Sequence, residues 1–176
     1  IDRAGPGVPA SRVGQRVWVY QSQIGRPFGT AADYTVQPAG RAVPLPAGAS
    51  FTDGACLGVP VMTAHRCLFA DGPVTGKTVL VPGGAGAVGN YAVQLAKLDG
   101  AQVISTVSSD QKAEIARAAG ADQVVNYRAE DPAKRILEIT GGTGVDHIVD
   151  VDFAGNFHVS REVLRANGVL AVYAGG

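Results

Sequence analysis

The 176 residues are enough for one domain with a buried core, or for one domain and part of another. With 46% apolar and 17% charged residues, the chain is too hydrophobic for a disordered tail, and no run of about 18 apolar residues predicts a membrane span. Fifteen basic and fifteen acidic residues cancel, so the net charge gives no sign of nucleic-acid or anionic-membrane binding. Cys56 and Cys67 are too few for a disulfide scaffold and suit a reducing, cytoplasmic compartment.

Short β-like runs separated by glycine and proline characterise the chain before residue 75. Residues 16–20, 32–36 and 41–45 predict strands of an irregular antiparallel unit. A helical stretch at 53–70 follows, and Pro60 must kink it or split it in two.

Strand and helix patterns alternate after residue 75. Helical patterns at 87–98, 111–119 and 157–164, and a helix start at Asp131 and Pro132, separate strand-like runs at 78–81, 102–107, 124–125, 147–151 and 169–173. Parallel neighbours need such crossovers, so the five strands predict an α/β fold with a doubly wound parallel sheet, the Rossmann fold. We therefore divide the chain into part of a β domain at 1–60 and this α/β domain at 61–176.

A glycine-rich turn joins the first of these five strands to the first helix after it. Gly84, Gly86 and Gly89 satisfy G-x-G-x-x-G in the strand–turn–helix context that dinucleotide binding requires. Gly84 would allow the tight turn, Gly86 would let the backbone approach a pyrophosphate, and Gly89 would let the helix lie close to the strand. The helix N-terminus would offer free N–H groups and a partial positive charge to the phosphates. A glycine-rich turn without a ligand is the alternative.

The tip of the second of these strands, at 106–109, reads Thr-Val-Ser-Ser and has no carboxylate. A site for NADH usually places Asp or Glu there to accept from both ribose hydroxyls. Two hydroxyls and the charge of Lys112 suit the 2′-phosphate of NADPH instead. Asp110 has nearly the right spacing for a ribose, but we expect it in the first turn of the next helix.

Cysteine and histidine positions show no pattern of a metal site. Cys56, Cys67, His65, His147 and His158 match neither paired-cysteine spacing nor an H-E-x-x-H helix. We expect both cysteines to be small buried residues, and His147, within an apolar strand, to be a hydrogen-bonded core or edge histidine. The sequence predicts no metal ligand and identifies no catalytic residue.

Six segments occur in a recognisable order: Gly-Gln-Arg-Val-Trp at 14–18, Ala-Asp-Tyr at 32–34, Gly-Ala-Cys-Leu-Gly-Val-Pro at 54–60, Thr-Ala at 63–64, Val-Leu-Val-Pro-Gly-Gly-Ala-Gly-Ala-Val-Gly at 79–89 and Val-Asn-Tyr-Arg at 125–128. Together they resemble the zinc-free quinone oxidoreductases, the zeta-crystallin branch of the medium-chain dehydrogenase/reductase superfamily. The resemblance covers nearly the whole chain. It implies a GroES-like catalytic domain before a nucleotide-binding domain, and NADPH that passes a hydride to a quinone or another activated alkene.

The resemblance also implies that parts of the family's architecture lie outside these residues. Part of the catalytic domain precedes a segment like 14–18 in the family, and a sixth strand follows a segment like 169–173. We therefore expect the chain to be an excerpt that binds the cofactor weakly at best and is inactive alone. The complete protein is expected to be a homodimer that takes a small-molecule substrate.

The cofactor-binding residues implied by the resemblance fall into four groups. They are Thr63 beside the nicotinamide; Gly84, Ala85, Gly86, Ala87, Val88 and Gly89 in the turn, of which 85–88 lie at the pyrophosphate; Ser108, Lys112 and Tyr127 at the adenosine ribose and its 2′-phosphate; and Asn156, Tyr173 and Ala174 elsewhere along the cofactor.

Simpler structural roles compete at four of these positions. Asn156 could be the N-cap of the helix that follows it. Lys112 could be a solvated charge, Tyr127 ordinary packing at a strand end, and Thr63 a helix residue bonded to the preceding turn. Two other functions also stay open: an enoyl reductase of lipid or polyketide synthesis, and a nucleotide-binding module without turnover.

Overall fold

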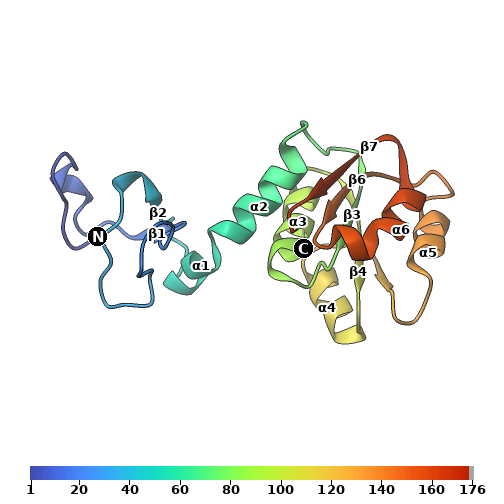
Figure 1. Cartoon of the computed structure of the whole chain (residues 1–176), viewed down its shortest axis with the longest axis horizontal. Helices are drawn as coiled ribbons and strands as arrows, with labels where there is room; N and C mark the ends of the chain where they lie inside the picture. The colour runs from blue at the N-terminus through green and yellow to red at the C-terminus, as the bar shows by residue number, and fades with distance from the viewer. Residues whose placement is uncertain (175–176) are drawn as a thin grey trace. The chain divides into compact units, whose positions relative to one another are not determined.

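The computed structural model describes residues 1–174, and the chain forms two compact units, Ile1–Pro60 and Val61–Gly176. Figure 1 traces the chain from blue at the N-terminus to red at the C-terminus. The first unit is small and irregular, whereas the second is a layered α/β unit.

A two-stranded antiparallel sheet organises the first unit. β1 (Val17–Val19) pairs with β2 (Ala42–Pro44), and Trp18 lies opposite Val43. This pairing confirms two of the three strands predicted in this part of the chain, with shorter bounds.

The prediction of a strand at 32–36 is wrong. Tyr34 and Val36 in this segment are 79% and 84% exposed, and the segment joins no sheet. A strand forms only beside a neighbour that takes its N–H and C=O groups, and neither β1 nor β2 pairs with this segment. Aromatic and β-branched composition alone therefore does not make this segment a strand.

Pro60 divides the predicted helical stretch into two helices. α1 (Phe51–Cys56) begins at a capping box in which Ser50 Oγ accepts the Asp53 N–H (3.0 Å) and Asp53 Oδ2 accepts the Ser50 N–H (2.8 Å). α2 (Val59–Phe69) has Pro60 as its second residue, where the missing N–H has no helical partner to lose. Splitting, one of the two predicted outcomes, is therefore what occurs.

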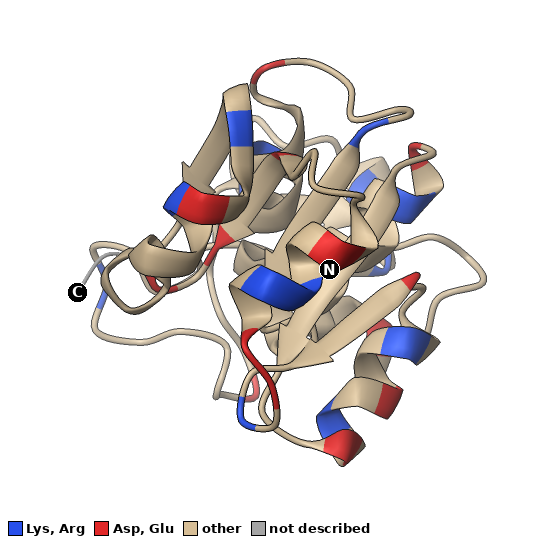
Figure 2. Cartoon of the chain, turned by 90° about the vertical axis from the view of Figure 1, so that its right-hand side faces the viewer, with Lys and Arg blue, Asp and Glu red and all other residues tan. Residues whose placement is uncertain are grey.

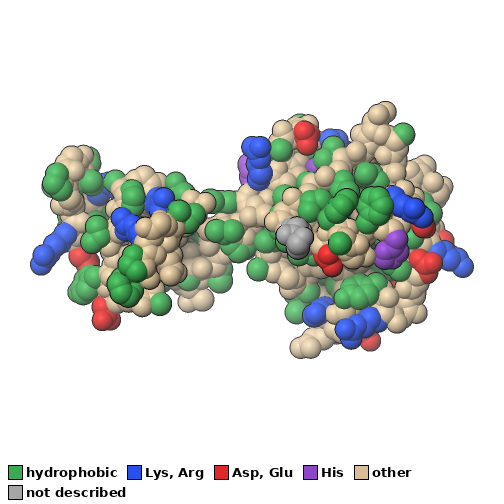
Figure 3. All heavy atoms as spheres, viewed as in Figure 1, with side chains coloured by type: hydrophobic (Ala, Val, Ile, Leu, Met, Phe, Trp, Pro, Cys, Tyr) green, Lys and Arg blue, Asp and Glu red, His purple; other side chains and the backbone are tan. Residues whose placement is uncertain are grey.

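The two cysteines differ in burial. Cys67 is buried as predicted, but Cys56 is exposed, so that prediction is wrong for Cys56. Cys56 ends α1 in a unit where, within residues 1–60, Leu45 is the only buried large apolar side chain. Figure 3 shows apolar side chains spread over the surface of this unit. A unit with so little interior leaves the end of its helix in solvent.

Five parallel strands form the sheet of the second unit. In spatial order they are β5 (Gln123–Asn126), β4 (Gln102–Val107), β3 (Thr78–Pro82), β6 (Val145–Asp150) and β7 (Leu164–Val172). The central strand is the first in sequence, and the chain builds outward from it on both sides. The predicted doubly wound parallel sheet is confirmed.

Helices cover both faces of this sheet (Figure 1). α2, α3 (Ala87–Leu98) and α4 (Asp110–Ala118) share one apolar cluster with one face. α5 (Pro132–Ile139) and α6 (Phe153–Val163) share a second cluster with the other. Alternate side chains of β3 belong to the two clusters, because successive side chains of a strand point to opposite faces.

α6 and β7 begin earlier than the predicted helix at 157–164 and strand at 169–173. The Asp152 side chain accepts the Gly155 N–H (3.1 Å), and this cap starts α6 at Phe153. β7 begins at Leu164, directly after α6, and its register against β6 then shifts. Asn167, with φ 63°, accommodates the irregularity that the sequence pattern did not show.

His147 connects β6 to α2. Its side chain is buried, and its Nε2 lies 2.8 Å from the Cys67 carbonyl oxygen, which accepts the hydrogen bond. Burial lowers the pKa of His147, against the opposite effect of this hydrogen bond. The prediction of a hydrogen-bonded core histidine is confirmed.

Charged residues of both signs alternate along the helices (Figure 2). Within residues 1–174, every helix is too short or too polar to span a bilayer.

Candidate functional site

The carboxyl ends of the parallel strands meet around β3, where the direction of chain progress through the sheet reverses. The chain proceeds from β3 to β4 and β5 on one side, then returns to β6 and β7 on the other. Loops that leave such a point in opposite directions open a crevice, and open α/β sheets bind ligands there. β3 ends at Pro82, directly before the glycine-rich turn.

Gly83 makes the turn, and Gly84 packs against the neighbouring strand. Gly83 has φ +72°, and its N–H donates to the Thr106 carbonyl (2.9 Å). The Gly84 N–H donates to Ser105 Oγ (3.1 Å), and this hydroxyl donates to the Val81 carbonyl (2.9 Å). A Cβ at Gly84 would collide with the Ser105 side chain, whose own Cβ would be 3.0 Å away. The tight turn predicted for Gly84 therefore falls on Gly83, and Gly84 serves close packing.

Gly86 and Gly89 differ in what surrounds them. A Cβ at Gly89 would lie 2.8 Å from the carbonyl carbon of Gly83 and 3.0 Å from the Cα of Gly84. Gly89 thus permits a close approach of α3, but to the turn rather than to the strand. A Cβ at Gly86 would meet only the Gly83 carbonyl oxygen, at 3.2 Å, and Gly86 is exposed.

The first turn of α3 faces solvent without a side-chain cap. Gly86 is the N-cap residue, Ala87 is exposed, and Ala85 and Val88 are half-buried. The first N–H groups of a helix have no partner within it, and with the helix dipole they attract an anion. The structure therefore brings the four predicted pyrophosphate residues together at one accessible helix end.

Ser108 and Lys112 come together at the tip of β4. Lys112 Nζ donates to Ser108 Oγ (3.1 Å), and Lys112 is exposed on α4. Ser109 caps α4 by accepting the Lys112 N–H (3.3 Å), and Asp110 lies in the first turn of that helix, as expected. A hydroxyl and an ammonium group thus stand side by side where the sequence has no carboxylate.

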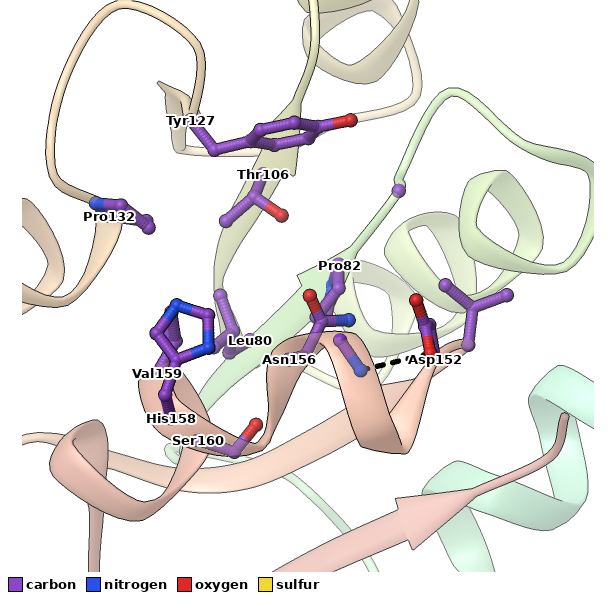
Figure 4. A pocket seen from close by; sticks show the side chains of 13 residues that line it. Leu80, Pro82, Thr106, Tyr127, Pro132, Asp152, Asn156, His158, Val159 and Ser160 are labelled. Atoms are coloured by element: carbon purple, nitrogen blue, oxygen red, sulfur yellow. Dashed lines mark hydrogen bonds between the residues drawn. The ribbon is translucent and has the colours of Figure 1, made fainter. Parts of the chain in front are cut away.

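A hollow of about 410 Å³ lies between the strand ends and α6 (Figure 4), within the size range of small-ligand sites. It is lined by Leu80, Pro82, Gly83, Thr106, Tyr127, Pro132, Val151, Asp152, Gly155, Asn156, His158, Val159 and Ser160. Its lining combines apolar side chains with hydroxyl, amide, imidazole and carboxyl groups. Of the predicted site residues outside the turn, Tyr127 and Asn156 belong to this lining.

Asn156 is bonded to the end of β6 and does not cap α6. Its Nδ2 donates to Asp150 Oδ1 (2.7 Å), and the Asp152 N–H donates to the same oxygen (3.0 Å). The alternative in which Asn156 is the N-cap is wrong, because Asp152 takes that role four residues earlier. The Asp150 side chain is fully buried, and its Oδ2 has no hydrogen-bond partner within residues 1–174.

Besides the residues of the turn and of the β4 tip, three further predicted residues lie outside the lining of the hollow. Thr63 is half-buried in α2, and Ala174, the last described residue, is exposed. The Tyr173 N–H donates to the Asp150 carbonyl (3.2 Å), and the Tyr173 side chain packs on the first apolar cluster. Burial, with smaller effects of Cys67 and Asp150, raises the pKa of Tyr173 to about 12.

Sequence reasoning missed several residues of the hollow. Thr106, Val151 and Asp152 lie at the ends of β4 and β6, and their positions at strand ends were a usable signal. His158 and Ser160 come from α6, and nothing in their local pattern indicated that this helix would line a hollow. The Ser160 hydroxyl is buried and has no partner within residues 1–174.

These features fit a dinucleotide. The open N-terminus of α3 suits two phosphates, and the adjacent hollow has room for a base and a ribose. Within residues 1–174, no three His, Cys, Asp or Glu side chains converge as metal ligands, and zinc-free chemistry stays a prediction.

The sequence profile of a family described as zinc-binding dehydrogenase matches residues 87–176. Across 98% of its length the chain is 34% identical to a 2-haloacrylate reductase of Burkholderia sp and 31% identical to a quinone oxidoreductase of Rattus norvegicus, of which it covers 52% and 51%. It is 32% identical over 91% of its length to a crotonyl-CoA reductase of Streptomyces avermitilis and covers 40% of that protein. The chain thus spans about half the length of the first two relatives and less of the third.

Solved structures share the fold over nearly the whole chain. A quinone oxidoreductase of Pseudomonas syringae pv. Tomato superposes with a TM-score of 0.86 at 31% identity, covering 99% of this chain and 53% of that one. A mycobacterial protein solved in complex with NADPH superposes with a TM-score of 0.83 at 35% identity, covering 99% of this chain and 54% of the other.

Proposed function

The chain belongs to the zinc-binding dehydrogenase family of the medium-chain dehydrogenase/reductase superfamily. We propose that it is the part of an NADPH-dependent oxidoreductase that binds the cofactor. The proposed reaction is hydride transfer to a quinone or another activated alkene, without zinc. One observation supports the cofactor site above the others: the uncapped N-terminus of α3 opens beside a hollow at the reversal point of the sheet.

The chain's own residues would hold successive parts of the cofactor. The N–H groups of Ala87 and Val88 would bind the pyrophosphate, which Gly86 allows to approach. The hollow would take the adenosine, with Tyr127 in its wall. Thr63 would lie beside the nicotinamide, and Tyr173 and Ala174 are proposed as further contacts. A bound nicotinamide supplies the hydride, and the protein's part is to position it and exclude water.

Ser108 and Lys112 support NADPH over NADH. Their side chains meet at the β4 tip, where a hydroxyl and an ammonium group suit the 2′-phosphate. The hollow does contain one carboxylate, Asp152, but it follows β6, and one of its oxygens already caps α6. The solvated-charge alternative for Lys112 predicts no such preference.

Titration of NADPH and NADH against the complete protein and its Lys112→Ala variant tests this site. Loss of a charge-assisted contact of roughly 1.5–3 kcal/mol should weaken NADPH binding about tenfold or more and leave NADH unchanged. Lys134→Ala, an exposed lysine on α5 outside the hollow, is the matched control and should change neither. An equal loss for both cofactors, or a wild type that prefers NADH, would contradict the proposal.

The acceptor is proposed at the level of its chemical class. The named relatives support two candidates, a quinone or enone on one side and an enoyl thioester on the other. Steady-state assays of the complete protein with quinones, enones and enoyl thioesters separate them, and strong thioester reduction without quinone activity would replace the first candidate. Nucleotide binding without any turnover would favour a binding module.

The first unit, residues 1–60, is proposed as part of a GroES-like catalytic domain, and the complete protein as a homodimer. Leu45 is the single buried large apolar side chain of residues 1–60. So small a core supports the proposal that these residues form part of a larger domain. Light scattering of the complete protein tests the dimer, and a monomeric mass at micromolar concentration would reject it.

A further inference from the structure

Asp150 holds the Asn156 amide in one orientation. Asp150 Oδ1 accepts both the Asp152 N–H (3.0 Å) and the Asn156 Nδ2 (2.7 Å), and the Asp150 side chain is fully buried. Because the Asp152 N–H can only donate, the oxygen that it meets must accept. Asn156 must then turn its amino group toward Asp150 and its carbonyl oxygen away from it.

The carbonyl oxygen of Asn156 therefore faces the hollow as a fixed acceptor. Asn156 belongs to the lining, and Figure 4 shows its amide oxygen on the side of Thr106 and Tyr127. A reversed amide would set two acceptors against each other and leave the Asp150 carboxylate short of a donor, which is unfavourable because that side chain is fully buried. The orientation is set by the protein before any ligand arrives.

We propose, on the basis of the adenosine site proposed above, that Asn156 Oδ1 accepts a hydrogen bond from the adenosine part of the cofactor and that Asp150 is the residue that positions it. The donors on the adenosine part of NADPH are the 6-amino group of the base and the ribose 3′-hydroxyl, because the 2′ oxygen carries the phosphate. Asp150 lies behind Asn156 and acts through it. A ligand that presents only acceptors at this point would bind less well.

Four nucleotides distinguish the donors: AMP, purine riboside 5′-monophosphate (hydrogen in place of the 6-amino group), 2′-deoxy-AMP and 3′-deoxy-AMP. Each is titrated by NMR into the complete protein and into its Asn156→Leu variant. One analogue should bind wild type about tenfold more weakly than AMP, and Asn156→Leu should remove that difference. Loss with the purine analogue assigns the base, and loss with 3′-deoxy-AMP assigns the ribose; either supports the proposal. Loss with 2′-deoxy-AMP alone would contradict it, because NADPH carries a phosphate at that position.

The role of Asp150 is tested by two substitutions. Asp150→Asn still offers an oxygen to the Asp152 N–H and to Asn156, so it should keep the difference between AMP and the discriminated analogue. Asp150→Ala releases the amide and should reduce the difference, whereas a purely structural role would lower both affinities equally. If Asp150→Ala does not fold by circular dichroism, Asn156→Leu still decides the proposal.

Equal affinity of wild type for all four nucleotides, or a difference that persists in Asn156→Leu, would overturn this inference. Retained NADPH binding would then leave the proposed function intact. Failure of wild type to bind NADPH or AMP would instead reject the proposed function, and this inference with it.

Discussion

Alanine at Gly89 and at Gly86 should separate the folding role of the glycine-rich turn from its binding role. A Cβ at Gly89 would lie 2.8 Å and 3.0 Å from main-chain carbons of the turn, which cannot rotate away. Overpacking of this kind costs about 1–3 kcal/mol. For a domain of this size that lowers Tm by roughly 2–4 °C per kcal/mol.

Gly86→Ala should behave in the opposite way. Gly86 has φ −82°, which alanine adopts freely, and the new Cβ would meet only one carbonyl oxygen at 3.2 Å. The expected loss of stability is about 1 kcal/mol or less, from the poorer N-cap. The methyl group would occupy the approach to the first turn of α3, so NADPH binding should fall about tenfold or more through lost phosphate contacts.

Urea denaturation and calorimetric titration of both variants measure the two effects separately. Gly48→Ala is the control, because no atom lies within 4 Å of its added Cβ and the position is outside the turn. A Gly86→Ala variant as unstable as Gly89→Ala, or one that binds NADPH like wild type, would refute the assignment of roles.

Three further predictions concern buried polar groups. Ser105→Ala leaves the Gly84 N–H unpaired and should cost about 1–3 kcal/mol in urea denaturation; an unchanged midpoint would contradict this. Because burial lowers the pKa of His147 below its usual 6.5, the unfolded chain binds a proton more readily, so stability should fall from pH 7 to pH 5 and fall less in His147→Asn. Burial raises the pKa of Tyr173 to about 12, so Tyr173→Phe should remove the last step of the tyrosinate absorbance titration. A last step that survives the substitution would contradict this prediction.

The elements around the glycine-rich turn were predictable because independent signals agree there. α3 and β4 have the predicted bounds, since a glycine turn, a helical period and Gly100 at φ +87° all mark the same limits. The Asp131 cap with Pro132 behind it fixed the start of α5 in the same way. Where the local residue preferences agree with what the folded structure requires, one sequence is enough to predict the element.

The errors arose where a distant partner decides the structure. The segment 32–36 has strand composition but no strand beside it, and Cys56 has an apolar pattern around it but no interior to enter. α6 was placed late because the predicted start at 157 took no account of Asp152, whose side chain caps the helix. The hollow depends on how α6 approaches the strand ends, which no local pattern encodes, so Asn156 was predicted but its pairing with Asp150 was not.

Within the turn itself the contacts are largely between main-chain atoms, and this bears on how such proteins diversify. The Gly83 carbonyl meets the Gly86 N–H (2.8 Å), and Gly89 lies against the same peptide, so little of the geometry depends on side-chain identity at Ala85 or Ala87. A phosphate-binding site formed by main-chain N–H groups tolerates substitutions that would abolish a site formed by side chains. The chain is 31–34% identical to reductases named for a haloacrylate, a quinone and a crotonyl thioester. Proteins with this turn can thus differ in their acceptors while they keep the proposed nucleotide-binding backbone.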